Sequence, residues 1–146
     1  MSDFGHWVFD TSTLVSAALR VGSLPHRALA HALMVGELCV SATTLAELDE
    51  VLMRPKFDRY QTVDTRKAFT AFIRLHAILF EVSDVDVVSV QPPCRDPKDN
   101  QFLALIQASD ANGLISSDTD LLVLHPWNGV PILSPADFLM RSGCPV

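Results

Sequence analysis

Short β-prone runs that each lead into a helical segment recur along the whole chain, and this alternation constrains the fold more than any other feature. The runs cover residues 6–9, 38–40, 113–116 and 130–133, and a valine-rich segment over residues 80–90 is expected to be extended. Helices are expected over residues 11–19, 25–35, 43–53, 97–111, 118–124 and 135–140, and from residue 64 onward. Strands that alternate with helices are typical of an α/β fold. We therefore expect a mainly parallel sheet of about four to five short strands with helices on both faces.

Chain length and composition indicate a single domain. The 146 residues are 49% apolar, which is enough for one hydrophobic core across residues 1–146. The longest apolar run, residues 102–106, is far shorter than the roughly 18 residues that a membrane span needs. The three cysteines (Cys39, Cys94 and Cys144) form neither a CxxC pair nor a disulfide framework, which favours a reducing compartment. We expect a soluble, cytoplasmic protein that does not associate with membranes.

Charge is distributed unevenly along the chain. The net charge of −6 argues by itself against a nucleic-acid partner. Residues 81–120 hold eight acidic and two basic side chains, whereas residues 54–74 hold six basic and two acidic ones. An acidic region beside a basic one fits an acidic metal site with a phosphate-binding flank. Solvated helix faces are the alternative explanation.

Four carboxylates lie where an expected strand meets an expected helix. Asp10 ends the first strand, Glu47 lies in the first turn of the helix after the second strand, and Asp99 lies in the first turn of the helix behind Pro97. Asp118 follows the strand over residues 113–116. Because the carboxyl ends of parallel strands meet at one edge of a sheet, these four side chains are expected to converge.

Helix capping explains the same residues one at a time. Asp10 and Asp118 occupy ordinary N-cap positions, and Thr44 with Glu47 has the spacing of a capping box. Asp99 at a helix start complements the helix dipole. Capping does not explain why all four gather at one edge, where uncompensated carboxylates repel one another.

A divalent cation resolves this repulsion, since no Lys or Arg directly neighbours Asp10, Glu47 or Asp118 in the sequence. An all-carboxylate set suits Mg²⁺ or Mn²⁺. Zinc is disfavoured because no His or Cys pair has ligand spacing. Carboxylates that leave water on Mg²⁺ allow that water to attack a phosphodiester, so metal-dependent hydrolysis of nucleic acid is the favoured hypothesis.

Four segments resemble the motifs of PIN-domain nucleases, in the same order and with similar spacing over nearly the whole chain. Residues 8–17 (VFDTSTLVSA) resemble the family's opening, and residues 41–57 (SATTLAELDEVLMRPKF) its second motif. Residues 94–105 (CRDPKDNQFLAL) resemble the third and most specific motif, and residues 114–122 (LISSDTDLL) the fourth. The likeness is to the subgroup of VapC-like toxins from toxin–antitoxin pairs.

This resemblance implies a PIN-like α/β/α sandwich and a Mg²⁺-dependent endoribonuclease, with Mn²⁺ as a substitute ion. Asp10 and Asp99 would be the primary metal ligands, and Glu47 and Asp118 would complete the catalytic acidic site. Asp120 matches a further acidic position of the family. The resemblance also implies an RNA substrate, a cognate antitoxin protein and a homodimer.

The sequence departs from the family pattern at two places. Many relatives have Asn where Ser12 stands, and Thr-Gly where Ser116 and Ser117 stand. Neither departure removes a carboxylate, but both touch loops of the expected site. They leave room for a catalytically weak PIN scaffold that acts by binding RNA or protein. A small-molecule phosphohydrolase is a third hypothesis, which the absence of a nucleophile motif disfavours.

The basic segment supplies the candidate contacts to the RNA backbone. Arg54, Lys56 and Arg59 follow soon after the Glu47 helix, so they are expected to flank the acidic site and neutralise phosphates.

Overall fold

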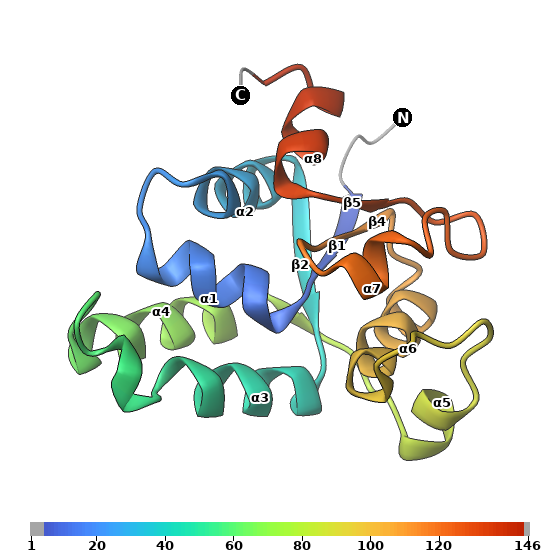
Figure 1. The fold of residues 1–146 in the computed structure, drawn as a ribbon, viewed down its shortest axis with the longest axis horizontal. Coiled ribbons are helices and arrows are strands. Elements are labelled where there is room, and N and C mark those ends of the chain that lie inside the picture. Colours follow the sequence, from blue (N-terminus) through green and yellow to red (C-terminus); the bar gives the residue numbers. More distant parts are fainter. Residues whose placement is uncertain (1–4, 145–146) are drawn as a thin grey trace.

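A computed structural model describes residues 5–144 and shows a five-stranded, wholly parallel sheet in the order β3-β2-β1-β4-β5. The strands are β1 (Gly5–Phe9), β2 (Gly36–Val40), β3 (Ile78–Leu79), β4 (Gly113–Ile115) and β5 (Ile132–Leu133). The longer helices are α1 (Thr11–Leu19), α2 (Leu24–Val35), α3 (Ala42–Leu52), α4 (Val63–His76), α6 (Asn100–Ser109) and α8 (Pro135–Arg141). Two short helices, α5 (Asp84–Val88) and α7 (Thr119–Leu122), and two 3₁₀ turns, η1 (Pro55–Phe57) and η2 (Pro97–Asp99), complete the fold (Figure 1). The expected α/β class with a parallel central sheet is confirmed.

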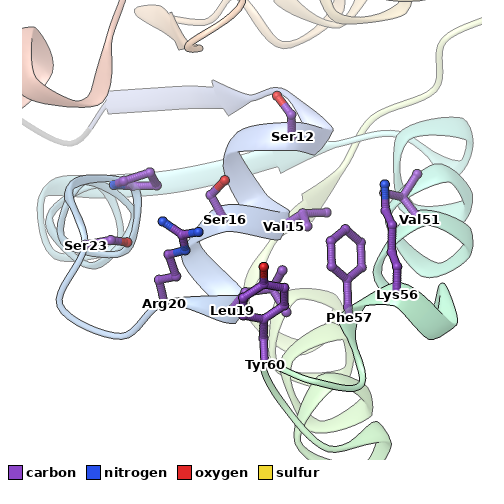
Figure 2. Close-up of a pocket in the computed structure, with 11 residues that line it drawn as sticks. Ser12, Val15, Ser16, Leu19, Arg20, Ser23, Val51, Lys56, Phe57 and Tyr60 are labelled. Atoms are coloured by element: carbon purple, nitrogen blue, oxygen red, sulfur yellow. The ribbon is translucent and has the colours of Figure 1, made fainter.

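The loop between α3 and α4 is built around a buried arginine. The Arg66 guanidinium donates from Nη1 to the Leu52 carbonyl (2.9 Å) and from Nε to the Gln61 carbonyl (3.1 Å), and it forms an ion pair with Asp58. Gln61 in turn donates from Nε2 to the Leu19 carbonyl at the end of α1 (3.3 Å). These bonds hold the loop against α1, and Figure 2 shows side chains from both facing the space between them.

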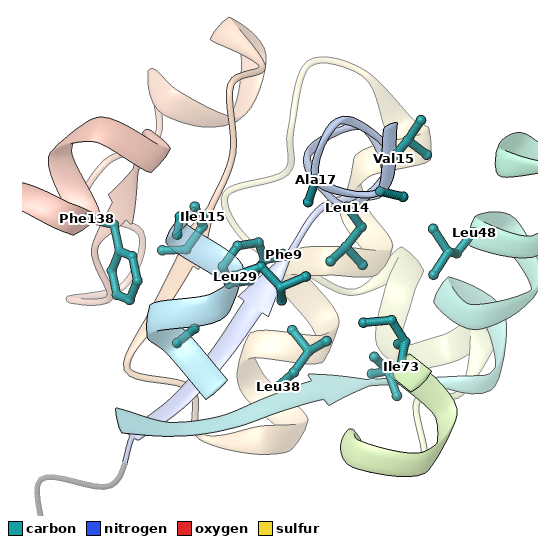
Figure 3. Close-up of a cluster of buried hydrophobic side chains, with 14 of the residues drawn as sticks. Phe9, Leu14, Val15, Ala17, Leu29, Leu38, Leu48, Ile73, Ile115 and Phe138 are labelled. Atoms are coloured by element: carbon teal, nitrogen blue, oxygen red, sulfur yellow. The ribbon is translucent and has the colours of Figure 1, made fainter. Parts of the chain in front are cut away.

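The sheet separates two hydrophobic clusters. Because consecutive strand residues point to opposite faces, Phe9 packs with α1, α2, α3 and α8 on one face, and Val8 packs with α6 on the other. Figure 3 shows the first cluster, in which Phe9, Leu14 and Leu38 gather between the sheet and the surrounding helices. Burial of side chains of this size stabilises the fold by about 1.5–3 kcal/mol each.

The strand register aligns the ends of the two central strands. Phe9 of β1 lies opposite Ile115 of β4, so the residues that follow them, Asp10 and Ser116, leave the sheet side by side. The Asp10 amide continues the ladder by donating to the Ile115 carbonyl (3.3 Å). This register places Asp10 beside the segment after β4 that carries Asp118.

Two expected elements differ in the structure. The segment 80–90 is not extended throughout, since Ser83 and Asp86 form a reciprocal capping box that starts α5. The expected helix behind Pro97 begins as the 3₁₀ turn η2 and continues as α6, which ends where Asp110 adopts a left-handed conformation (φ 52°). Within residues 5–144, none of the helices has the length and apolar character needed to cross a membrane.

Candidate active site

Asp10 lies at the carboxyl end of β1, and only 3% of its surface is exposed. Its Oδ1 caps α1 by accepting from the Thr13 amide (3.0 Å), and its Oδ2 accepts from the Ser116 hydroxyl (2.5 Å). Burial raises the pKa of Asp10 above its ordinary value, although the hydrogen bonds from Ser116 and Thr13 oppose this rise. The carboxylate therefore combines a structural cap with a buried charge.

Ser116 and Asp118 extend this arrangement along the end of β4. The buried Ser116 Oγ accepts from the Asp118 amide (2.9 Å) while its hydroxyl donates to Asp10. Asp118 caps α7 by accepting from the Asp120 amide on Oδ1 (2.9 Å). One serine hydroxyl thus links the two strand ends that carry the aspartates.

Asp99 precedes α6, and unlike Asp10 and Asp118 its side chain makes no capping hydrogen bond. Desolvation by burial, a shared hydrogen bond with Asp118 and the charges of Asp118, Asp96 and Asp10 raise the pKa of Asp99 from 3.8 to about 7. These interactions place Asp10, Asp99 and Asp118 within one electrostatically coupled group. Capping therefore accounts for two of the three aspartates, whereas Asp99 Oδ2 faces the Cys94 thiol at 4.0 Å.

Glu47 is held toward the same edge by two neighbours. It accepts a hydrogen bond from the Thr11 hydroxyl and another from Gln101 Nε2 (3.2 Å). The expected pairing of Thr44 and Glu47 in a capping box is wrong, because Ser41 caps α3 reciprocally with Thr44. Since the helix begins at Ala42, Glu47 lies in its second turn rather than its first. Glu47 does not cap α3, and its hydrogen bonds link it to Thr11, which follows Asp10, and to Gln101, two residues after Asp99.

Asp120 lies at the border of this group. Its Oδ1 is 4.0 Å from Nη1 of the exposed Arg95. Its backbone amide donates the hydrogen bond through which Asp118 caps α7. The structure thus places Asp120 next to the acidic residues, with its carboxylate paired toward Arg95.

The four carboxylates provide the right chemistry for a hard divalent cation, although they do not form a finished cage. Within the described residues, no group of three or more Asp, Glu, His or Cys side chains is arranged so that it could hold a metal ion. Oxygen donors are the ligands that Mg²⁺ prefers, and Mg²⁺ usually keeps several waters and uses only one or two carboxylates. Burial raises the pKa of both Asp10 and Asp99, and neighbouring acids add to the rise. The donor set at this edge therefore fits Mg²⁺ or Mn²⁺.

Open space lies beside Asp118. A cavity of about 360 Å³ is lined by Ser12, Thr13 and Ser16 of α1 and by Ser117 and Asp118 after β4. The Ser12 hydroxyl is 3.4 Å from Asp10 Oδ1 and donates to it. A substrate group can thus approach the acidic edge between α1 and the loop after β4.

The structure separates the basic residues of segment 54–74 into different roles. Arg54 pairs with Glu50 (3.0 Å), and the Lys56 ammonium lies 5.0 Å from the centre of the Phe57 ring. The Arg59 guanidinium lies 5.3 Å from the centre of the Tyr60 ring. All three candidate RNA contacts are exposed. Arg66 is instead 1% exposed and donates to backbone carbonyls of the loop. The prediction that it contributes to a phosphate-binding surface is therefore wrong.

Sequence reasoning did not assign site roles to Thr11, Gln101 or Ser116. Thr11 and Gln101 lie next to motif aspartates, but nothing in the sequence indicates that both reach Glu47. Ser116 stood out only as a departure from the family's Thr. The structure shows that this departure keeps the hydroxyl that reaches Asp10.

Comparisons with known proteins agree with this architecture. The structure of PAE2754 from Pyrobaculum aerophilum is similar with a TM-score of 0.60 and 17% identity, over 95% of this chain and 97% of that one. VapC20 from Mycobacterium tuberculosis, described as a toxin that cleaves the sarcin–ricin loop, is similar with a TM-score of 0.54 and 17% identity, over 78% of this chain and 91% of that one. At this identity the two structures establish the fold alone. A comparison with curated protein sequences gives no significant match.

A family model for the PIN domain matches residues 6–120, a range that contains every acidic residue described above. The match covers more than half of the chain and agrees with the parallel sheet and flanking helices of the structure. PIN domains are in general nucleases, so membership supports a nuclease role. The chain belongs to the PIN-domain family.

Proposed function

We propose that this chain is a single PIN domain that acts as a Mg²⁺-dependent endoribonuclease, with Mn²⁺ as a substitute ion. The observation that carries the proposal is Asp99, which does not cap a helix and whose pKa is raised to about 7 by burial and by neighbouring acids. Within the described residues, Asp10, Glu47, Asp99 and Asp118 have no Lys or Arg ion-pair partner. A purely structural role would not require acids to gather at this edge.

The residues divide naturally into two roles. Asp10 and Asp99 are proposed as primary metal ligands, and Glu47 and Asp118 as the residues that orient water and accept its proton. When bound, Mg²⁺ lowers the pKa of a coordinated water and balances charge on the phosphate. Thr11 and Gln101 hold Glu47 by hydrogen bonds, which limits the freedom of its carboxylate.

Two findings support RNA as the substrate. The exposed cations Arg54, Lys56 and Arg59 lie on the loop that is bonded to the Leu19 end of α1, the helix that Asp10 caps at its other end. VapC20, which shares the fold, is described as a sarcin–ricin loop cleaving toxin. We accordingly propose a toxin of a toxin–antitoxin pair, held by a cognate antitoxin and assembled as a homodimer.

A catalytically weak scaffold that binds RNA or protein is the second candidate. The observation that favours it is the capping role of Asp10 and Asp118, which employs one oxygen of each carboxylate in local structure. Metal ligation by Asp118 would then rely on its other oxygen, and ligation by Asp10 on Oδ2, which also accepts from the Ser116 hydroxyl. The two candidates differ in one measurable property, the cleavage of RNA.

RNA cleavage with Mg²⁺, Mn²⁺ or EDTA tests the proposal. We expect metal-dependent cleavage by the wild type and a loss of at least about a hundredfold in Asp10→Asn and Asp99→Asn. Asp110→Asn is the matched control, because it removes one exposed charge at a left-handed position that Asn tolerates. Absence of cleavage by folded, antitoxin-free wild type would favour the scaffold. Cleavage of a simple phosphate ester but not of RNA would favour a small-molecule phosphohydrolase.

A further inference from the structure

A second, larger cavity opens beside the acidic edge. It has a volume of about 540 Å³ and lies between α1, the start of α2, the end of α3 and the loop that follows α3 (Figure 2). Ser12 and Ser16 line both this cavity and the smaller one that contains Asp118. The two spaces therefore meet along one side of α1. We call the larger one the Tyr60 pocket.

Aromatic rings and cations dominate the outer wall of the Tyr60 pocket. Tyr60 and Phe57 lie near Arg20 and Lys56 in Figure 2, and none of the residues 5–144 that line the pocket is acidic. The Tyr60 ring is 46% exposed, with the Arg20 and Arg59 guanidinium carbons 6.0 and 5.3 Å from its centre. Exposed rings offer a stacking surface to any nucleobase, and neighbouring cations attract the phosphates on either side.

The remaining wall combines apolar side chains with the hydroxyls of Ser12, Ser16 and Ser23. Val15 and Leu19 of α1 and Val51 of α3 line it. Arg66 fixes the loop that carries Phe57 and Tyr60 through the carbonyls of Leu52 and Gln61. A pocket of this size with apolar walls and a few polar groups is typical of small-ligand sites, and one nucleotide is a ligand of suitable size.

We propose that the Tyr60 pocket is a base-binding subsite, in which one nucleotide of the substrate RNA stacks on Tyr60 while Arg20 and Lys56 contact its phosphates. The inference rests on the proposed ribonuclease function and deepens it. Continuity with the acidic edge through Ser12 and Ser16 makes the bound nucleotide a near neighbour of the scissile bond. The cationic, acid-free lining favours RNA over a protein segment as the occupant.

The chain contains one tyrosine, so incorporation of 3-fluorotyrosine gives a ¹⁹F NMR signal that reports on Tyr60 alone. The probe is a single-stranded 12-nucleotide RNA of mixed sequence, added to the full chain in EDTA to prevent cleavage. We expect the signal to shift on RNA addition, and the Kd measured by fluorescence anisotropy to rise about five- to a hundredfold in Tyr60→Ala. Tyr60→Phe keeps the ring and should remain within about twofold of wild type.

Phe72→Ala is the matched control, because Phe72 is also an exposed ring, 44% accessible, but lines a different cavity against α2. Its RNA affinity should equal that of the wild type, and thermal unfolding checks that each variant is folded. The subsite alone is overturned if the protein still cleaves RNA but the ¹⁹F signal does not shift, or if Tyr60→Ala and Phe72→Ala lose equal RNA affinity. A protein segment would then be the better candidate for the occupant of the pocket. Absence of both RNA binding and cleavage overturns the proposed function together with the subsite.

Discussion

The Ser116 hydroxyl donates to Asp10 Oδ2 at 2.5 Å, across the ends of two neighbouring strands. The same oxygen accepts from the Asp118 amide, so a single buried side chain sets the relative positions of two proposed site residues. This link follows from the register that places Phe9 opposite Ile115.

Replacement of Ser116 by alanine should therefore affect both stability and the site. Loss of the hydroxyl leaves a buried carboxylate oxygen and a backbone amide without their partner, which destabilises the fold by about 1–3 kcal/mol. Urea unfolding measures this difference. The neighbouring exposed Ser117→Ala serves as control and should change the free energy of unfolding by less than about 0.5 kcal/mol. Equal stability of the two variants would show that the bond to Asp10 contributes nothing.

Asp99 should make the free energy of unfolding depend on pH in a predictable direction. Its pKa rises from 3.8 to about 7 on folding, so between these values the folded chain binds more protons than the unfolded chain. In EDTA, the contribution of Asp99 to the free energy of unfolding is greatest below about pH 4 and falls as pH rises toward 7. Asp99→Asn should match the wild type at pH 4 and exceed it at pH 8 by about 1–2 kcal/mol, a figure reduced for partial exposure.

Thermal unfolding of both proteins across this pH range measures the effect. For a chain of this length, 1 kcal/mol corresponds to about 2–4 °C in Tm. A constant difference between wild type and Asp99→Asn at all pH values would contradict the raised pKa of Asp99.

Thr11 should act as a positioning residue through Glu47. Thr11→Val removes the hydroxyl that donates to Glu47 but keeps the side chain's shape. We expect the rate of RNA cleavage to fall by about 10–100-fold, as is typical when a residue that hydrogen-bonds to a metal ligand is replaced. Thr11→Ser restores the hydroxyl and should recover most of kcat. Failure of serine to restore activity would indicate that packing rather than the hydrogen bond matters.

Arg66 should contribute to stability rather than to phosphate binding by its own charge. Arg66→Met leaves the carbonyls of Leu52 and Gln61 without a donor and should lower the free energy of unfolding by about 2–4 kcal/mol. Arg66→Lys should not restore it, because one ammonium cannot reproduce the guanidinium geometry. Lys67→Met, at the exposed next position, is the control for loss of a positive charge and should be nearly neutral. Chemical denaturation distinguishes these variants.

Lys56 should contribute to RNA affinity in a salt-dependent way. If its ammonium neutralises one phosphate, Lys56→Ala should reduce the slope of log K against log salt by about 0.7 for single-stranded RNA. Lys67→Ala removes an equivalent charge from α4 and should leave the slope unchanged. Fluorescence anisotropy from 50 to about 300 mM salt measures both slopes. Identical slopes for all three proteins would remove Lys56 from the binding surface.

Much of the fold could be predicted because local signals and the global fold agree. Residues 11–19 follow a capping aspartate, Asp10, and have an apolar pattern, and α1 has those bounds. The segment 80–90 is the counterexample, since its valines favour a strand whereas Ser83 and Asp86 stabilise a helix start. The stability of a strand depends on pairing with a neighbouring strand. Pairing with β2 extends over β3 (Ile78–Leu79), just before this segment.

The motifs predicted that the acidic residues would lie near one another, but not the hydrogen bonds that organise them; their roles in a site stay a prediction. Thr11 and Glu47 are 36 positions apart, and Ser116 and Asp10 are 106 apart. Such contacts depend on the strand register and on helix orientation, which no local pattern specifies. The burial of Arg66 is similar, because its partners are backbone carbonyls that every residue possesses.

Anomalous diffraction from crystals grown with Mn²⁺ at about pH 8, where Asp99 is ionised, is the most direct test of the proposed metal site. We expect one or more Mn²⁺ peaks contacted by Asp10 and Asp99, with Glu47 or Asp118 reaching them directly or through water, and no such peak in Asp99→Asn. Crystals of active, antitoxin-free protein that show no manganese at this edge, or that bind it only elsewhere, would contradict it.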